Sequence, residues 1–534
     1  MFPLSWQRRS LRTHCFLISF RGCVSALLAS GFLLSFCLLD ASAARALPRV
    51  RFKDVIDQAR QLSTTPYQDM ATALPDAFKT MGYDQWRGIR YRPDQALWAK
   101  EPFSAQFFHP GFLYQYPVRI NYIDNTGTYL MQYSSDLFRY DTPGLKELLP
   151  DKDNSYAGFR IHYPLNTTAY ADELISFLGA SYFRALGRNL RYGLSARGLA
   201  INTGAENGEE FPVFREFWLV KPSPKAKQIV IYALLDSATL TGAYEFTVIP
   251  GEKTLMKVNM FLFFRQQSKK LGIAPLTSMF FYGEDSGFRG VSDFRPEVHD
   301  SDGLLVHTAS GERLWHPLLN PERLLINTFS GATPLGFGLL QRDINFDHYQ
   351  DLEARYERRP SVWVTPQGDW GAGHLELVQI PTENEYNDNI VAYWVPEKAF
   401  ERGDSVNYSY TLSWQSHEVP ATPATGIVTA TRVVRKDDDL IILVDFDKDA
   451  DKEDIWGNTL SEDVWCAQGA QITDSQIIIN DVTGGRRLVL RARLDPPRFI
   501  DEVLPYQKTA VEFRAFLKRD GRPLTETWSY TYFP

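Results

Sequence analysis

The chain has 534 residues, a mass of 61.1 kDa and a formal net charge of −7 at pH 7. This acidic balance argues against a nucleic-acid-binding protein, which needs a basic surface to neutralise phosphates. With 44% hydrophobic and 23% charged residues, the composition is that of a globular protein. The length allows roughly two to four ordinary domains, or two unequal domains if one is a large all-β domain.

The segment 1–43 differs in character from the rest of the chain. Arginines precede an apolar run, Val24–Leu39, and the small residues Ala41-Ser42-Ala43 follow it. This order is typical of a secretory signal peptide, which we expect to be removed after Ala43. An uncleaved membrane anchor is the alternative, because the run approaches the length of a membrane-spanning helix. Three of the four cysteines lie in this segment, so Cys466 alone remains in the exported chain and no disulfide can form within it.

The exported chain is predicted to be mostly β-strand. Apolar residues at helical spacing predict one helix over Phe52–Leu62, and a second helix is predicted over Asp172–Leu178. Elsewhere, short strands alternate with Gly, Pro and Asn, which favours a large antiparallel β-sandwich. Clear strand candidates are rich in β-branched and aromatic residues: Ile229–Leu235, Met256–Phe264, Leu440–Phe446 and Leu488–Leu494.

A polar segment divides the predicted β structure into two parts. Residues 396–405 contain Pro396 and Gly403 and predict a linker. The residues before it, 44–395, then form the large β-sandwich domain. Residues 406–534 have the length of one immunoglobulin-like β-sandwich with long connections.

Two local patterns resemble functional motifs but lack an essential residue. Gly193–Arg197 begins like the nucleophile elbow of hydrolases, yet Arg197 stands where glycine is required. The alternate aspartates of 445–451 resemble a calcium loop, but Ala450 and Trp456 replace the required glycine and glutamate. The sequence contains no Cys/His cluster, HExxH motif or phosphate loop. We therefore expect neither a metal nor a cofactor.

Carboxylates and aromatic residues are concentrated between Asp285 and Trp394. Flat aromatic rings pack against the C–H faces of sugars, and carboxylates accept protons from sugar hydroxyls. Glycoside hydrolysis also needs two carboxyl groups that flank the bond. This pattern indicates a carbohydrate site, whereas the alternative is that the acids lie in exposed turns, where they are common. The candidate substrate-binding residues are Glu385, His299, Asp302, Arg359, Trp363 and Trp370.

Several segments between Phe52 and Tyr530 carry a resemblance to a known family. In chain order they are LGASYFR (178–184), YGLSARGLA (192–200), LGIAPLTSMF (271–280), EVHDSDG (297–303), GFGLLQR (336–342), RPSVWVT (359–365) and NDNIVAYW (387–394). Together they resemble the periplasmic glucans biosynthesis proteins G and D. The resemblance implies a periplasmic protein in which a large, cleft-bearing β-sandwich precedes a smaller immunoglobulin-like sandwich.

The same resemblance implies a role in making osmoregulated periplasmic glucans, whose backbone is β-1,2-linked glucose. Members of the family resemble inverting β-1,2-glucanases, which are glycoside hydrolases. The resemblance places the catalytic acid on Asp388, the candidate base on Asp300 and a supporting tyrosine on Tyr356.

Two functions are compatible with these residues. The chain is either an inverting endo-β-1,2-glucanase that trims the glucan backbone, or a non-catalytic glucan-binding protein. In the second case it would receive glucan from an inner-membrane synthase and present it for branching. Asp388 and Asp300 favour the enzyme, but a binding cleft can use the same acids. The signal resembles the G branch of the family, whereas Asp302 and the C-terminal Tyr532-Phe533-Pro534 resemble the D branch.

Overall fold

The computed structural model describes residues 47–70, 74–148, 154–268, 270–286, 293–416, 426–447, 455–457, 459–496 and 510–534. The predicted signal peptide lies outside these residues. Within them, strands greatly outnumber helices, so the all-β prediction is confirmed. The helices found in these ranges are all too short or too polar to cross a membrane.

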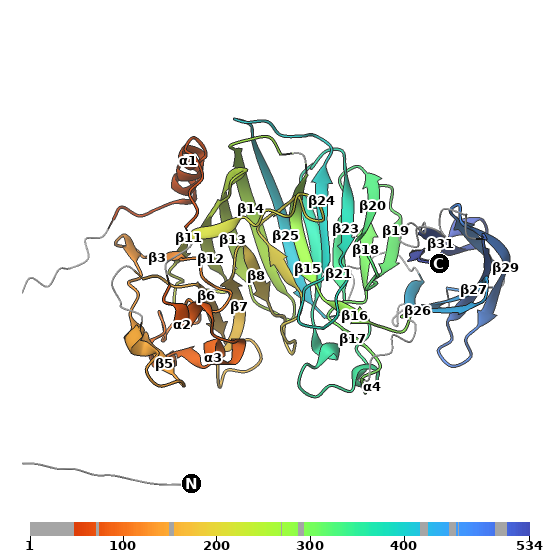
Figure 1. Cartoon of the computed structure of the whole chain (residues 1–534), viewed down its shortest axis with the longest axis horizontal. Helices are drawn as coiled ribbons and strands as arrows, with labels where there is room; N and C mark the ends of the chain where they lie inside the picture. Colours follow the sequence, from red (N-terminus) through yellow and green to blue (C-terminus); the bar gives the residue numbers. More distant parts are fainter. Residues whose placement is uncertain are drawn as a thin grey trace, which may run out of the picture. The chain divides into compact units, whose positions relative to one another are not determined.

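Two large antiparallel-rich sheets form the main sandwich (Figure 1). In the described residues the first sheet has ten strands, in the order β2 (Ser104–Phe108), β6 (Gly158–Tyr163), β7 (Asp172–Leu178), β8 (Tyr182–Ala185), β9 (Ser195–Arg197), β15 (Leu271–Ser278), β24 (Ile390–Pro396), β23 (Gly373–Gln379) and β20 (Leu325–Gly331), with β10 (Ala200–Ile201) paired to β15.

The second sheet has fifteen strands over the same ranges. Their order is β28 (Leu460–Cys466), β31 (Val511–Arg519), β33 (Thr527–Tyr532), β19 (Arg313–Pro317), β18 (Gly303–His307), β21 (Gly336–Leu340), β22 (Ser361–Gln367), β25 (Ser405–Gln415), β14 (Thr254–Phe264), β13 (Leu240–Ile249), β12 (Ile229–Asp236), β11 (Val213–Val220), β3 (Arg119–Ile123) and β4 (Thr128–Leu130), with β32 (Arg522–Pro523) paired to β31.

An aromatic core holds the two sheets together. Phe159 and Phe177 from the ten-stranded sheet contact Phe217 on β11, at ring-centroid distances of 4.9 and 5.2 Å. Phe177 also contacts Phe246 on β13 at 5.2 Å. All four side chains are almost fully buried. Because successive side chains of a strand point to opposite faces, this core leaves the other face of each sheet for different partners.

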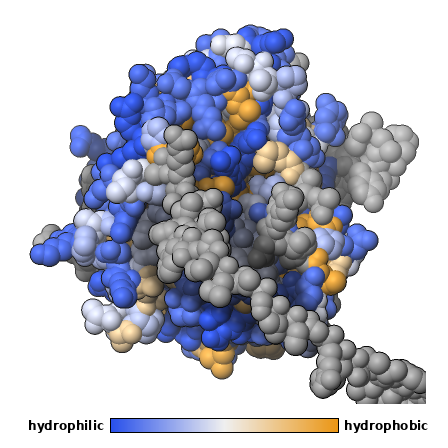
Figure 2. Space-filling view, turned by 90° about the vertical axis from the view of Figure 1, so that its left-hand side faces the viewer, coloured by the Kyte–Doolittle hydropathy of each residue, from blue (hydrophilic) through white to orange (hydrophobic). Residues whose placement is uncertain are grey.

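The predicted N-terminal helix is confirmed and covers part of the outer face of the fifteen-stranded sheet. Helix α1 (Phe52–Ser63) buries Val55 and Ala59 against Trp218, Leu234 and neighbouring residues of that sheet. Figure 2 views the side on which α1 lies. Where the grey residues leave it visible, this side is mostly hydrophilic, and apolar residues form only small separate patches.

The second predicted helix is wrong, because Asp172–Leu178 forms strand β7. Its residues pair with β6 on one side and β8 on the other, and these ladder hydrogen bonds outweigh the helical spacing of its apolar residues. The four strand candidates named from the sequence fall on β12, β14, β27 (Asp439–Asp447) and β30 (Arg486–Leu494) and are confirmed.

Short elements complete the fold. The remaining helices are α2 (Asp76–Lys79), α3 (Tyr83–Arg87), α4 (Phe346–Tyr349) and the 3₁₀ turns η1 (Pro93–Gln95), η2 (Ser135–Leu137), η3 (Lys146–Leu148) and η4 (Tyr356–Arg358). Two small sheets pair β1 (Ile89–Tyr91) with β5 (Phe138–Tyr140) and β16 (Phe280–Tyr282) with β17 (Val298–His299).

A smaller sandwich follows near the C-terminus. Its four-stranded sheet has the order β26 (Ile427–Lys436), β27 (Asp439–Asp447), β30 (Arg486–Leu494) and β29 (Ala470–Ile479). This sheet shares a buried core with β31 and β33, which include Phe513 and Trp528. Since β33 also pairs with β19, the fifteen-stranded sheet runs from the large sandwich into the smaller one.

The strand directly after the predicted linker belongs to the large sandwich. β25 begins at Ser405 and pairs with β14 and β22 in the middle of the fifteen-stranded sheet. The sequence predicts that residues 406–534 form the smaller domain. The four-stranded sheet begins only at Ile427, so residues 405–415 belong with the sheet that precedes them.

A buried ion cluster joins the two sandwiches. Glu526 is fully buried, and its carboxylate pairs with Arg313 at 2.9 Å and with Arg342 at 2.8 Å. It also accepts a hydrogen bond from the backbone N–H of Val428, at the start of the four-stranded sheet. Both guanidinium groups are about nine-tenths buried, and they share the Glu526 carboxylate as a counter-charge.

We expect Glu526→Gln to destabilise the protein by about 3–5 kcal/mol, because it removes the negative charge that two buried guanidinium groups share. Denaturant unfolding monitored by tryptophan fluorescence measures the change. Asp439→Asn is the control, since the Asp439–Arg493 pair is exposed and its loss should cost about 1 kcal/mol or less. Equal stability of the Glu526→Gln variant and the wild-type protein would contradict the structural role of the cluster.

Candidate functional site

Asp300 directly follows β17 and lies at the centre of the candidate site. The side chain is largely buried, and Oδ1 lies 3.3 Å from Nε of Arg359. Burial raises the pKa of Asp300, and the charge of Asp388 raises it further, whereas the charges of Arg359, Arg184 and His299 lower it. The net direction is upward, so the ordinary acidity of this carboxyl group is weakened.

Asp388 lies on the exposed loop between β23 and β24. Burial raises the pKa values of Asp300, Tyr114 and Tyr182, and the charge of Asp388 raises each of them further. The next residue, Asn389, anchors the loop. Its amide accepts from the backbone N–H of Phe280 at 2.9 Å and donates to the carbonyl of the same residue at 3.0 Å.

Tyr356 opens the 3₁₀ turn η4 and links the site to a second group of charges. Its hydroxyl donates to Oε2 of Glu385 at 3.0 Å, and Glu385 forms an ion pair with Arg295 at 2.7 Å. Burial and the charges of Glu385 and Asp300 raise the pKa of Tyr356 far above its usual value. The phenol therefore stays protonated and can act as a hydrogen-bond donor at any physiological pH.

Two grooves adjoin these residues. One has a volume of about 460 Å³ and is lined by Arg359 together with Glu173, Tyr192 and Glu353. The other has a volume of about 540 Å³ and is lined by residues of the Asp388 loop, including Glu383 and Asn387. Each groove is therefore lined by a residue next to, or paired with, one of the two aspartates, although neither aspartate lines a groove itself.

Four of the predicted substrate-binding residues do not line this site as expected. Trp363 and Trp370 are each 5% exposed. Trp363 is part of the apolar core of the smaller sandwich, and Trp370 packs edge-on against Tyr408 and Tyr410. These two rings are core residues, and neither presents a face to a sugar.

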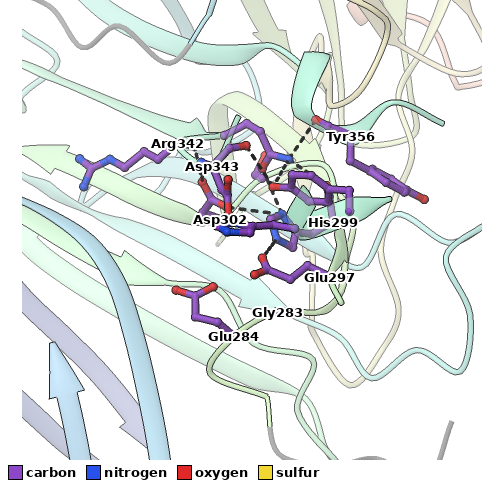
Figure 3. A network of polar contacts seen from close by, with 12 residues as sticks. Gly283, Glu284, Glu297, His299, Asp302, Arg342, Asp343 and Tyr356 are labelled. Carbon is purple, nitrogen blue, oxygen red and sulfur yellow. Dashed lines mark hydrogen bonds and ion pairs between the residues drawn. The ribbon is translucent and has the colours of Figure 1, made fainter. Parts of the chain in front are cut away.

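The other two residues, His299 and Asp302, form a buried polar network behind the site (Figure 3). His299 is 1% exposed, so it cannot contact a glucan. Asp302 points toward a small cavity of about 30 Å³ that is also lined by Arg342 and by Thr431 of the smaller sandwich. Burial raises the pKa of Asp302 to about 6.

Within this network the neighbours of His299 favour its charged form. Burial alone would lower its pKa, but a 2.9 Å bond to Glu297 and the charges of Asp302, Glu297 and Glu284 raise the pKa to about 9. Its other ring nitrogen faces Oε1 of Gln341 at 3.1 Å and Oδ1 of Asp302 at 3.5 Å. With both nitrogens bound to acceptors, the doubly protonated ring is the favoured form.

Sequence reasoning missed several residues that surround the two aspartates. Arg184 on β8 influences Asp300, Tyr114 and Tyr182 electrostatically, and its Nε donates to Ser195 at 2.6 Å. The sequence could have indicated them, because Tyr182 and Arg184 are two residues apart in the LGASYFR segment and therefore lie on the same face of a strand. Tyr386, next to Glu385, is 87% exposed and offers an aromatic face at the site.

Three possible metal ligands lie near one another in the part of the chain that the structure describes. Ligand atoms of Glu297, Asp343 and His348 lie within 4.8 Å of one another. Glu297 already binds His299, and Asp343 already pairs with His348. In the predicted acidic loop, Asp445 is bound by Arg432 and Arg487, while residues 448–454 lie outside the described ranges. The absence of a metal stays a prediction.

The sequence matches the family described as "Periplasmic glucan biosynthesis protein, MdoG" over residues 50–532. It is also 45% identical over 517 residues to Glucans biosynthesis protein G of Ralstonia nicotianae (strain ATCC BAA-1114 / GMI1000), in an alignment that covers 94% of this chain and 99% of that relative. The chain therefore belongs to the periplasmic glucan biosynthesis family, and the resemblance found in the sequence is confirmed. Membership implies involvement in periplasmic glucan biosynthesis and a periplasmic location.

The charge of His299 predicts how stability depends on pH. The pKa of His299 is about 9 in the folded protein and about 6.5 in the unfolded chain, and this difference adds about 3 kcal/mol to the free energy of unfolding. The full contribution is present below pH 6.5, and it is lost as the pH rises through 9. We expect the stability difference between wild type and His299→Gln to shrink across this range in denaturant unfolding.

His316→Gln is the matched control, because burial lowers the pKa of His316 to about 4 and its ring is neutral throughout the same interval. The stability difference between this variant and the wild type should stay constant from pH 6.5 to 9. A His299→Gln difference that is equally constant would contradict the buried cation.

Proposed function

We propose that this member of the periplasmic glucan biosynthesis family is an inverting endo-β-1,2-glucanase, with Asp388 as the general acid and Asp300 as the general base. The observation that carries the proposal is the electrostatic interaction between two carboxyl groups, of which one is exposed and the other is buried. Asp388 lies on an exposed loop, whereas Asp300 is buried and feels its charge. Burial of Asp300 by itself would favour a proton on that carboxyl group, so the assignment of Asp388 as the acid and Asp300 as the base follows the family resemblance.

The environment of Asp300 suits a base. A base becomes stronger as its pKa rises toward the working pH, provided that it remains ionised. Burial and Asp388 raise the pKa of Asp300, while the adjacent guanidinium of Arg359 favours the ionised form. In the proposed reaction Asp300 takes a proton from the attacking water, and Asp388 donates a proton to the departing sugar oxygen.

Tyr356 suits the task of holding the nucleophile. Its hydroxyl is fixed by Glu385, and the ring lies 5.3 Å beneath the guanidinium of Arg359, which is itself paired with Asp300. A water molecule or sugar hydroxyl between Tyr356 and Asp300 would therefore be oriented by two fixed groups. Such positioning removes part of the entropic cost of reaching the transition state.

The grooves support internal cleavage of a polymer. One adjoins Arg359 on the Asp300 side, and the other adjoins Asn387 on the Asp388 side. The proposal places one glucan chain in both grooves, with glucose units on either side of the two aspartates. Binding energy from remote units can then be used at the bond that breaks.

The second candidate function is a non-catalytic glucan-binding protein that presents nascent glucan from a membrane synthase for branching. One observation favours it: Asp300 is only 9% exposed, which restricts the access of an attacking water. The same raised pKa that strengthens a base also reduces the ionised fraction. Turnover of glucan by the wild-type protein discriminates between the two functions.

We expect Asp388→Asn and Asp300→Asn each to lower turnover of linear β-1,2-glucan by about a hundredfold or more, while binding of long glucan survives. Release of reducing ends measures turnover, and calorimetry measures binding. Asp439→Asn in the smaller sandwich is the control and should retain full activity. Undiminished turnover in either site variant would remove that residue from the mechanism, and a wild-type protein that binds without cleaving would favour the second function.

A further inference from the structure

Gln341 is a fully buried residue that directly follows β21 and touches the segments that carry the proposed catalytic groups. Its Nε2 lies 3.0 Å from the carbonyl oxygen of His299 and 3.2 Å from that of Tyr356. The same nitrogen lies 3.0 Å from the hydroxyl of Tyr349. Its backbone N–H donates to Oγ of Ser361 at 3.0 Å. One side chain and its backbone therefore connect β17, α4, η4 and β22.

Three of these four segments, β17, η4 and β22, hold or closely follow or precede a group of the proposed mechanism. His299 immediately precedes Asp300, and Tyr356 is itself the supporting tyrosine. Ser361 lies two residues after Arg359, the ion-pair partner of Asp300. The distances among these groups are therefore set by bonds that meet at Gln341, although Gln341 is too deeply buried to touch a substrate.

The His299 cation fixes the orientation of the Gln341 amide. A doubly protonated imidazole offers only donors, so the amide must turn its oxygen toward Nδ1 of His299. The amide nitrogen then faces the two backbone carbonyls, which accept hydrogen bonds and cannot donate them. His299 in turn is held by Glu297 and Asp302, and Glu284 faces the same charge (Figure 3).

The backbone at Gln341 is also anchored from the opposite side. The next residue, Arg342, forms an ion pair with Glu526, and its guanidinium stacks 3.6 Å from the ring centroid of Trp315. It also donates to the carbonyl of Val428 at 2.7 Å. The side chain of Gln341 is thus bound to the network behind the site, and the side chain of the next residue, Arg342, is bound to the smaller sandwich.

We propose that Gln341 is a positioning residue that sets the spacing between Asp300 and Tyr356. The proposal rests on the proposed glucanase function. Catalytic groups must be held to a fraction of an ångström, and a displacement of about 1 Å costs up to roughly a hundredfold in rate. Gln341 is the residue through which the Asp300 segment and the Tyr356 turn are bonded to a common donor.

The test uses Gln341→Met in the full exported chain. Methionine fills the same space but can neither donate to the two carbonyls nor accept from His299. We expect kcat on linear β-1,2-glucan to fall roughly tenfold to a hundredfold, with KM within about twofold of wild type. A lost hydrogen-bond network that only stabilised the fold would lower the melting temperature and leave kcat unchanged.

Gln379→Met is the matched control. Gln379 is equally buried, and its amide also makes two hydrogen bonds, to Leu319 and Asn327, neither of which belongs to the site. We expect it to lose stability while keeping kcat. An equal fall of kcat in both variants, or in neither, would overturn the positioning role.

Gln341→Glu keeps the proposal testable if the methionine variant does not fold. A glutamate retains the acceptor for the His299 cation but has no N–H for the carbonyls of His299 and Tyr356. It should fold and show the same loss of kcat, and full activity would overturn the proposal.

Crystal structures of the wild-type protein and the variants test the positioning role of Gln341 independently of the glucanase function. If the wild-type protein has no turnover, the glucanase proposal fails, and the geometry alone tests Gln341. Loss of the 3.0 Å contact between Tyr356 and Glu385 in the Gln341→Glu variant would support positioning. An unmoved Tyr356 and Asp300 would overturn it.

Discussion

The bond between buried His299 and Glu297 is the interaction on which the arrangement of the site depends. Several carboxyl groups lie behind the cleft, and concentrating negative charge away from water is costly unless cations compensate for it. His299 supplies a positive charge in their midst, and its two ring nitrogens bind Glu297 and face Gln341. That charge orients the Gln341 amide, which in turn connects the segments of Asp300 and Tyr356. A histidine that touches no substrate can thus influence where the substrate-facing groups lie.

Close packing of β21 against β22 also fixes the position of the segment that carries Gln341. A Cβ atom built on Gly336 would lie 2.4 Å from the ring of Trp363, and one on Gly338 would lie 2.2 Å from the carbonyl oxygen of Val362. Only glycine lets the tryptophan ring lie directly against the neighbouring strand. This explains why Trp363 is a core residue. It also explains how β21 holds Gln341 and Arg342, which directly follow it, in fixed positions between the site and the smaller sandwich.

The sequence predicted the type of fold and the central residues better than it predicted the boundaries and the supporting contacts. Strong β-branched runs such as Leu440–Phe446 identified strands because period and composition agreed. Asp172–Leu178 was misassigned because seven residues cannot separate a helical from a strand period when partner strands are unknown. The linker at 396–405 was placed at a polar turn, but only strand pairing shows that β25 returns to the large sheet.

For the site, too, the sequence predicted the central residues better than the contacts that support them. The family motifs identified Asp300, Asp388 and Tyr356 as a set, and the structure brings them into electrostatic reach of one another. Aromatic residues near acids were expected to bind sugar, yet Trp363 and Trp370 are buried, because composition does not reveal which face of a strand is solvent-exposed. Gln341 carried no chemical signal in the sequence, since an amide gains its role only from the groups that surround it.

We propose that Asp388 and Asp300 act as an acid–base pair on opposite sides of a β-1,2 bond. The configuration of the newly formed reducing end tests it most directly, by proton NMR of the products in the first minutes of turnover. Direct attack by water activated by Asp300 predicts that the α-anomer is produced first and then equilibrates. Initial release of the β-anomer would reveal a covalent intermediate and a nucleophilic carboxylate, and would contradict the assignment of Asp300 as a base.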